Sequence, residues 1–145
     1  MKILVIHGPN LNLLGEREPG VYGHLALADI DRKLQELARE LRVGIEMFQS
    51  NHEGRIIDKL HDMRKDVQGI LINPGAFTHY SYAIRDAIAA VDVPAMEVHL
   101  SDIYNREPFR ANSVIREVCI GQISGKGLES YMEGFRNLVK HLVPD

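Results

Sequence analysis

This chain of 145 residues has one cysteine, no tryptophan and no long apolar run. The single cysteine, Cys119, cannot form a disulfide within the chain, which fits a reducing compartment. It lies in an apolar run and is expected to be buried as a small hydrophobic residue. No stretch approaches the roughly 18 apolar residues of a membrane span. The apolar run 3–6 is shorter than the core of a signal peptide, which needs about 7–15 residues. We therefore expect a cytoplasmic protein with no membrane partner.

Charge of one sign is also lacking. The chain has 17 Lys and Arg against 20 Asp and Glu, a net charge of −3, and its basic residues are scattered. This pattern gives no electrostatic footprint for nucleic acid. Hydrophobic residues make up 45% and charged residues 26%, which is typical of a globular protein. The length suits one domain, so we expect a single domain over residues 1–145.

Apolar patterns alternate between those of strands and those of helices. Short continuous apolar runs predict buried strands at 3–6, 43–48, 69–72, 94–98 and 118–123. Amphipathic spacing predicts helices at 25–41, 53–63, 79–91 and 128–142. The alternation favours βαβ units, which give an α/β fold with a parallel sheet between helices on both faces.

Three polar segments follow the carboxyl ends of predicted strands. They are the long connections 8–24 and 100–117 and the turn 73–76. Long connections in compact α/β domains are usually functional or disordered. Open parallel sheets bind their ligands at the carboxyl edge. The sequence therefore predicts a ligand site at this edge, independently of any family.

The connection 8–24 carries a tyrosine, Tyr22, and an arginine, Arg17, among glycines. It lacks the glycine spacing of a dinucleotide loop and the Gly-Lys-Ser/Thr of a P-loop. A mobile lid with these two side chains could be catalytic. Free tyrosine has a pKa near about 10 and is a poor base at neutral pH, but a nearby guanidinium would stabilise the phenolate. From this loop alone, the better interpretation is that both are ordinary surface residues and not a catalytic pair.

The exit of the third predicted strand brings the Asn73 amide and the His79 imidazole to the same edge. A tight turn followed by a helix cap at Thr78 is a plain alternative. His79 and Asp86 are seven residues apart, so within one helix they would share a face. Such a pair could serve an interface or simply be solvated.

At the exit of the fourth predicted strand, Glu97 and His99 point to the same face. The carboxylate could fix the imidazole tautomer or favour its charged form, which would suit a general acid. The alternative is a buried histidine that Glu97 satisfies and that has no chemical role. Arg106 and Arg110 follow, and they could clamp a carboxylate or be exposed basic residues.

Several kinds of chemistry lack their residues. No His, Cys, Asp and Glu cluster has the spacing of a zinc site, no serine lies in a Gly-x-Ser-x-Gly elbow, and no lysine occupies an obvious Schiff-base position. The remaining groups point to metal-free proton abstraction and elimination. Two other classes stay open: a non-catalytic flavodoxin-like binding module, although the acidic pair of a phospho-receiver is missing, and a different small-molecule lyase on the same scaffold.

Five segments together resemble the type II 3-dehydroquinases. They are HGPNLNLLGEREPGVYG at 7–23, QSNHEG at 49–54, INPGAFTH at 72–79, EVHLS at 97–101 and REPFR at 106–110. They fall in the family's order and spread over essentially the whole chain. The resemblance implies a flavodoxin-like three-layer sandwich with strand order 2-1-3-4-5. It also implies trans (anti) elimination of water from 3-dehydroquinate to 3-dehydroshikimate through an enolate, in the shikimate pathway, with no cofactor.

The resemblance also assigns roles to residues of this chain. It implies Tyr22 as the base, Arg17 as the transition-state stabiliser, His99 as the acid and Asn10 as the holder of a water near the enolate oxygen, with a lid at about 10–24. Glu97 and Arg106 would support the site. The implied substrate-binding set is Asn73, His79, Asp86, the Leu100 backbone, Ser101 and Arg110. In the family the counterpart of Asp86 comes from a neighbouring subunit, and the usual assembly is a homododecamer of four trimers.

Three positions depart from the commoner family pattern. Tyr80 replaces a smaller threonine, DIYN at 102–105 replaces NIHA, and Lys126 stands where an aromatic residue is common. Two of these, Tyr80 and Asp102, adjoin expected site residues. We therefore expect them to bear on substrate affinity and inhibitor preference.

Overall fold

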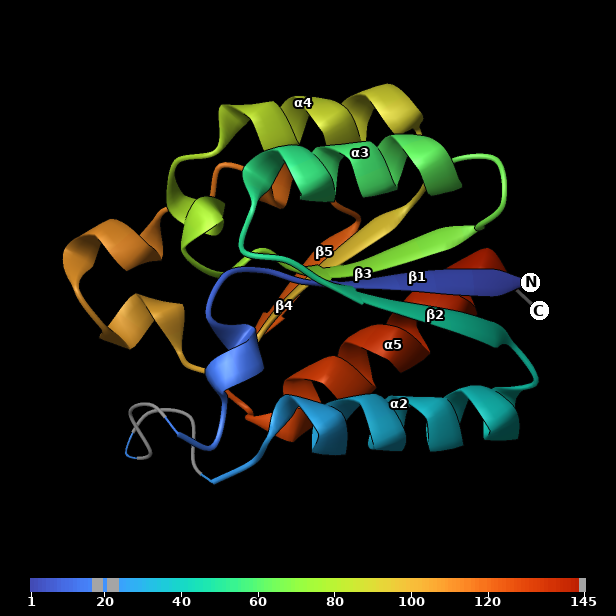
Figure 1. Cartoon of the computed structure of the whole chain (residues 1–145), viewed down its shortest axis with the longest axis horizontal. Coiled ribbons are helices and arrows are strands. Elements are labelled where there is room, and N and C mark those ends of the chain that lie inside the picture. The colour runs from blue at the N-terminus through green and yellow to red at the C-terminus, as the bar shows by residue number, and fades with distance from the viewer. Residues whose placement is uncertain (17–19, 21–23, 144–145) are drawn as a thin grey trace.

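The computed structural model describes residues 1–16, 20 and 24–143. Its five strands are all parallel and lie in the order β2-β1-β3-β4-β5 (Figure 1). Their bounds are β1 Lys2–His7, β2 Gly44–Gln49, β3 Gly69–Asn73, β4 Ala95–His99 and β5 Gly121–Ser124. The predicted flavodoxin-like order is confirmed.

Helices cover both faces of the sheet. Helices α2 (Leu27–Leu41) and α5 (Leu128–Leu142) lie on one face, and α3 (Glu53–Met63) and α4 (Tyr82–Val91) lie on the other (Figure 1). The described residues contain no helix whose length and apolar character would suit a membrane crossing.

The alternation of side chains along β1 explains the two layers. Ile3 and Val5 belong to the core cluster with α2 and α5, whereas Leu4 and Ile6 belong to the cluster with α3 and α4. All four are fully buried. Burying each such side chain stabilises the fold by roughly 1.5–3 kcal/mol. A central strand that is apolar on both sides therefore requires a helix layer on each face.

Helix α4 begins later than the predicted start at residue 79. A 3-10 helix, η2 (Gly75–His79), follows β3, and the Ser81 side chain then caps α4. The alternative cap, Thr78, is buried instead, and its hydroxyl has no hydrogen-bond partner among the described residues. His79 therefore lies outside α4, and the expectation that it shares a helix face with Asp86 is wrong.

The connection after β4 is more ordered than its sequence indicated. It contains three short 3-10 helices, η3 (Ile103–Asn105), η4 (Pro108–Ala111) and η5 (Arg116–Val118). η5 includes Val118, the first residue of the predicted fifth strand, and β5 itself begins only at Gly121. Cys119 thus precedes β5, and it packs half-buried against the core.

The exits of β1 and β3 are locked together at the carboxyl edge. The Gly8 amide donates to the Asn73 carbonyl over 2.7 Å. A Cβ atom at Gly8 would lie only 2.3 Å from the carbonyl carbon of Pro74, so no other residue fits there without moving backbone. Gly75 follows at φ +59°, in the left-handed region that favours glycine. This contact fixes the backbone from which the polar side chains project.

Candidate active site

A pocket opens at the carboxyl edge of the sheet, where the exits of β1, β3 and β4 meet. Its lining is Pro9, Asn10, Leu11, Asn73, Gly75, Ala76, His79, His99, Leu100, Ser101, Ile103, Arg106 and Arg110. Most of the residues predicted for the site therefore come together. Their positions follow from a parallel sheet whose strands all end at one rim.

Asn10 enters the pocket from the β1 exit. Its backbone is left-handed, with φ +68°, and its backbone N–H donates to Asn51 Oδ1 over 3.0 Å. Gln49 supports the same loop, because its Nε2 donates to the Gly8 carbonyl over 3.1 Å. The segment 49–54 thus acts by holding the β1 exit, although sequence analysis assigned no role to its individual residues.

His99 reaches the pocket from the end of β4, with Glu97 behind it. Both side chains lie on one face, as predicted, and both are buried. His99 Nε2 lies 2.5 Å from Glu97 Oε2. Because Nε2 contacts the carboxylate, Nδ1 is the ring nitrogen that is available for proton transfer. A carboxylate in this position stabilises the charged imidazole.

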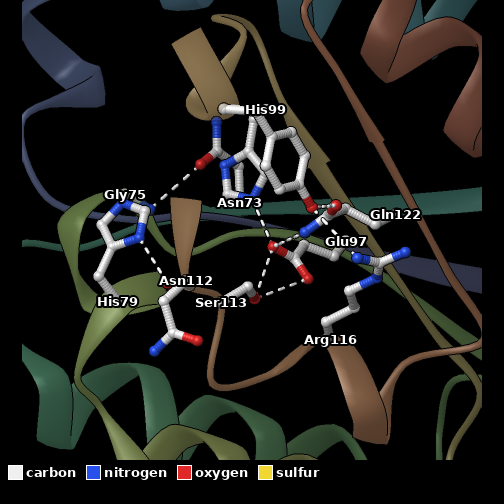
Figure 2. A network of polar contacts seen from close by, with 10 residues as sticks. Asn73, Gly75, His79, Glu97, His99, Asn112, Ser113, Arg116 and Gln122 are labelled. Carbon is white, nitrogen blue, oxygen red and sulfur yellow. Dashed lines mark hydrogen bonds and ion pairs between the residues drawn. The ribbon is translucent and has the colours of Figure 1, made fainter. Parts of the chain in front are cut away.

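Two further side chains hold Glu97 (Figure 2). Ser113 Oγ donates to the carboxylate oxygens over 3.0 and 2.9 Å, and Gln122 Nε2 donates to Oε2 over 2.9 Å. Sequence reasoning missed both. Gln122 is the register partner of Glu97 on β5, so the pairing of these two strands would have revealed it. Ser113 lies in an irregular connection and gives no comparable signal.

The Gln122 amide is itself oriented by its neighbours. The Tyr104 hydroxyl donates to Gln122 Oε1, and the Arg116 guanidinium donates to the Tyr104 hydroxyl over 3.3 Å. The carbonyl end of the amide is thus turned toward Tyr104, which leaves its N–H end for Glu97. Tyr104 belongs to the segment that departs from the family pattern, and here it supports the buried carboxylate indirectly.

His79 presents an acceptor to the pocket. Its Nδ1 lies 2.9 Å from the Asn112 backbone carbonyl, which can only accept, so Nδ1 carries the proton (Figure 2). Burial lowers the pKa of His79, and the nearby His99 and Arg110 lower it further. The imidazole is therefore neutral near pH 7, and its Nε2 can accept a hydrogen bond.

The two arginines give the pocket a cationic side. Arg106 Nη1 donates to Ser101 Oγ over 3.3 Å. Arg110 forms an ion pair with Glu107 and lies 4.8 Å above the Phe109 ring. Guanidinium groups bind carboxylates in bidentate fashion, so this side suits an anionic ligand.

Within the described part of the chain, two of the predicted site residues, Glu97 and Asp86, do not line this pocket. Asp86 is exposed on α4, and Ala83, which was expected to face inward, is exposed beside it. Arg17 and Tyr22 lie outside the described residues. Over residues 1–16, 20 and 24–143, no three His, Cys, Asp or Glu side chains are grouped closely enough to hold a metal ion.

The structure shows the exposure and contacts of the three residues that depart from the family pattern. Tyr80 is exposed. Asp102 caps η3 by accepting from the Tyr104 amide over 3.1 Å. Lys126 pairs with Glu133 over 2.7 Å. None of the three lines the pocket.

The fold and the pocket together define a flavodoxin-like α/β protein with a site for a small anionic molecule at the carboxyl edge of its sheet. The family model described as dehydroquinase class II matches residues 1–139. The chain belongs to this family.

Individual relatives agree over nearly the whole chain. The 3-dehydroquinate dehydratase of Nostoc sp. is 58% identical over 142 residues, which cover 98% of this chain and 97% of the relative. That of Geotalea daltonii is 56% identical over 142 residues, covering 98% and 99%. The crystal structure of the type II dehydroquinase from Butyrivibrio crossotus superposes with a TM-score of 0.94 at 48% identity, covering 96% of this chain and 97% of that one.

Proposed function

We propose that this chain is a hydro-lyase that converts 3-dehydroquinate into 3-dehydroshikimate and water, in the shikimate pathway of aromatic amino acid biosynthesis. Membership of the class II dehydroquinase family over residues 1–139 carries the proposal. The pocket supports it, because an anionic, polyhydroxylated ring finds arginines, an uncharged imidazole and an amide there. We take residues 1–145 as one catalytic domain whose lid covers about 10–24.

Proton removal falls to the lid in this mechanism. Tyr22, ionised next to Arg17, takes the proton from the carbon beside the ketone. The resulting enolate is stabilised by fixed dipoles, which are often the largest catalytic contribution. Asn10 stands at the pocket and would hold a water near the enolate oxygen. The roles of Tyr22 and Arg17 rest on the sequence motif alone.

Loss of the hydroxyl group falls to His99. With Nε2 hydrogen-bonded to Glu97, the charged imidazole donates its Nδ1 proton to the departing oxygen. The carbon–oxygen bond breaks, the electrons of the enolate form the new double bond, and the hydroxyl leaves as water. Tyr22 ends as a phenol and His99 as a neutral imidazole. A net transfer of one proton from Tyr22 to His99, through solvent, restores the enzyme.

Substrate binding is assigned to the remaining polar groups of the pocket. We propose that Arg110 with Arg106 attracts the substrate carboxylate, and that the Leu100 backbone and Ser101 complete its site at the end of β4. The Nε2 acceptor of His79 suits a ring hydroxyl, and Asn73 supplies an amide.

We further propose a cytoplasmic homododecamer of four trimers, in which Asp86 completes the pocket of a neighbouring subunit. Tyr80 and Tyr82 are 59% and 64% exposed, close in sequence to Asp86. Large exposed aromatic residues favour such an interface. Sedimentation would show a particle of about twelve chains, and a monomer that retained full activity would contradict this assembly.

The direct test follows the ultraviolet absorption of the conjugated enone in 3-dehydroshikimate. Purified protein should generate this absorption from 3-dehydroquinate at the same rate with and without a chelator. Absence of product from folded protein would refute the function. Loss of activity on chelation that added metal restores would refute the metal-free mechanism.

A further inference from the structure

A chain of four polar side chains joins the surface of α2 to the pocket, and the mechanism above uses only its last member. Asp31 Oδ1 lies 2.8 Å from His7 Nε2, and His7 Nδ1 lies 3.0 Å from the Tyr131 hydroxyl. The Asn73 side chain lies beside the Tyr131 hydroxyl and interacts with it as a donor. His7, Tyr131 and Asn73 are almost fully buried, and the Asp31 side chain is 27% exposed.

The sheet and one helix bring these residues together. His7 and Asn73 end neighbouring strands as register partners, and they share a face with Val5 and Leu71, which pack against α2 and α5. Tyr131 projects from α5 onto this face. Polar groups buried at such a point must satisfy one another, because water does not reach them.

Each hydrogen bond in the chain has one allowed direction. Asn73 Oδ1 accepts from the Gly75 amide over 3.1 Å (Figure 2), so Nδ2 is the end that faces Tyr131. Burial raises the pKa of Tyr131, so its hydroxyl keeps its proton. Because a donor of Asn73 faces the phenol oxygen, that proton goes to His7 Nδ1, which lies 3.0 Å away.

The direction then continues to the surface. A His7 ring that accepts at Nδ1 carries its proton at Nε2, and this N–H donates to Asp31. Reversing the Asn73 amide would place its oxygen against Tyr131 and its N–H group against the Gly75 amide, where two donors would face each other. The surroundings therefore permit one orientation of the amide.

We propose that Asp31, His7 and Tyr131 are positioning residues that hold the Asn73 amide with one N–H group free for a substrate oxygen. Nδ2 has two hydrogens, of which one faces Tyr131, and Asn73 lines the pocket. The site thereby favours a ligand oxygen that accepts at this point, such as a ring hydroxyl. The proposal rests on the function proposed above.

Tyr131→Phe is the primary test, because it removes one oxygen atom and leaves the ring in the core. A net hydrogen bond of this kind corresponds to a change in affinity of roughly 2- to 12-fold. We expect KM to rise within that range while kcat changes by less than about twofold. The control is Phe135→Leu, a change in the same buried helix that removes no polar group.

A double-mutant cycle separates positioning from general support of the fold. If Tyr131 acts through Asn73, Tyr131→Phe should raise KM in the wild-type background but not in Asn73→Ala. A purely structural role would give the same increase in both. His7→Asn is the second variant, because it breaks both histidine contacts, and it should reproduce the KM effect should Tyr131→Phe fold poorly.

The outcomes distinguish this inference from the proposed function. Absence of dehydration by the wild-type enzyme would overturn the function. The positioning role would be overturned if the wild type is active and KM is unchanged in folded Tyr131→Phe and His7→Asn. Additive effects of the two substitutions in the double-mutant cycle would overturn it as well. A KM increase that vanishes in Asn73→Ala would support it.

Discussion

Replacing Glu97 by glutamine changes the charge behind His99 with almost no change in volume. In the structure, three donors converge on this fully buried carboxylate, from His99, Ser113 and Gln122. An amide offers one acceptor oxygen and adds two N–H groups. At least one donor would therefore face another donor, and the charged imidazole would lose its counter-ion.

The expected magnitude follows from the contact that is lost. A hydrogen bond to a charged group contributes roughly 1.5–3 kcal/mol. If this loss falls on the proton-donating form of His99, kcat should drop by about 10- to 150-fold. KM should change far less, because Glu97 does not line the pocket.

The assay combines enone absorption with urea unfolding of each variant. Glu46→Gln is the matched control, because the same chemical change occurs on β2, where Glu46 pairs with Lys2 and Lys59 away from the pocket. Its kcat should equal that of the wild type. A folded Glu97→Gln enzyme with unchanged kcat would refute the argument that this carboxylate supports the acid.

Other expectations follow from single contacts. Gly8→Ala should lower the free energy of unfolding by about 1–3 kcal/mol, measured in urea, because its Cβ would overlap Pro74. Arg17→Ala should lower kcat more than it raises KM in steady-state assays, because its proposed role is in the transition state. His79 has a lower pKa in the folded chain than in the unfolded chain. As pH falls below 6.5, the unfolded chain therefore binds more protons, and this residue lowers the free energy of unfolding. The unfolding free energy of His79→Gln should accordingly decline less steeply than that of the wild type across this window, and parallel curves would contradict the sign. A substrate deuterated at one position beside the ketone should lose the hydrogen anti to the hydroxyl group, as mass spectrometry of the product would show.

Periodicity predicted the helices and strands well because their apolar faces are set locally. The bounds of α3 and α5 match the sequence patterns, and the apolar run of β1 became a strand buried on both faces. The predicted start of α4 was wrong because a 3-10 helix, η2, follows β3 first, next to the tight approach of Pro74 to Gly8. That approach joins segments far apart in sequence, and no local pattern reveals it.

In the candidate site, too, some features could be predicted from local sequence patterns and others could not. Glu97 and His99 could be paired from strand geometry, since they are two residues apart on one strand. The partners of His7 could not, because Asp31 and Tyr131 are 24 and 124 positions away. The family motifs supplied the roles of Tyr22 and Arg17, which no pattern of spacing would have fixed.

The central claim is that a phenolate and an imidazole divide the elimination between them. The rate of enone formation by folded Tyr22→Phe and His99→Ala tests it most directly. Acid–base assistance is typically worth about 10²–10⁴-fold, so each variant should lose at least about 100-fold in kcat. Near-normal turnover in either folded variant would contradict the account.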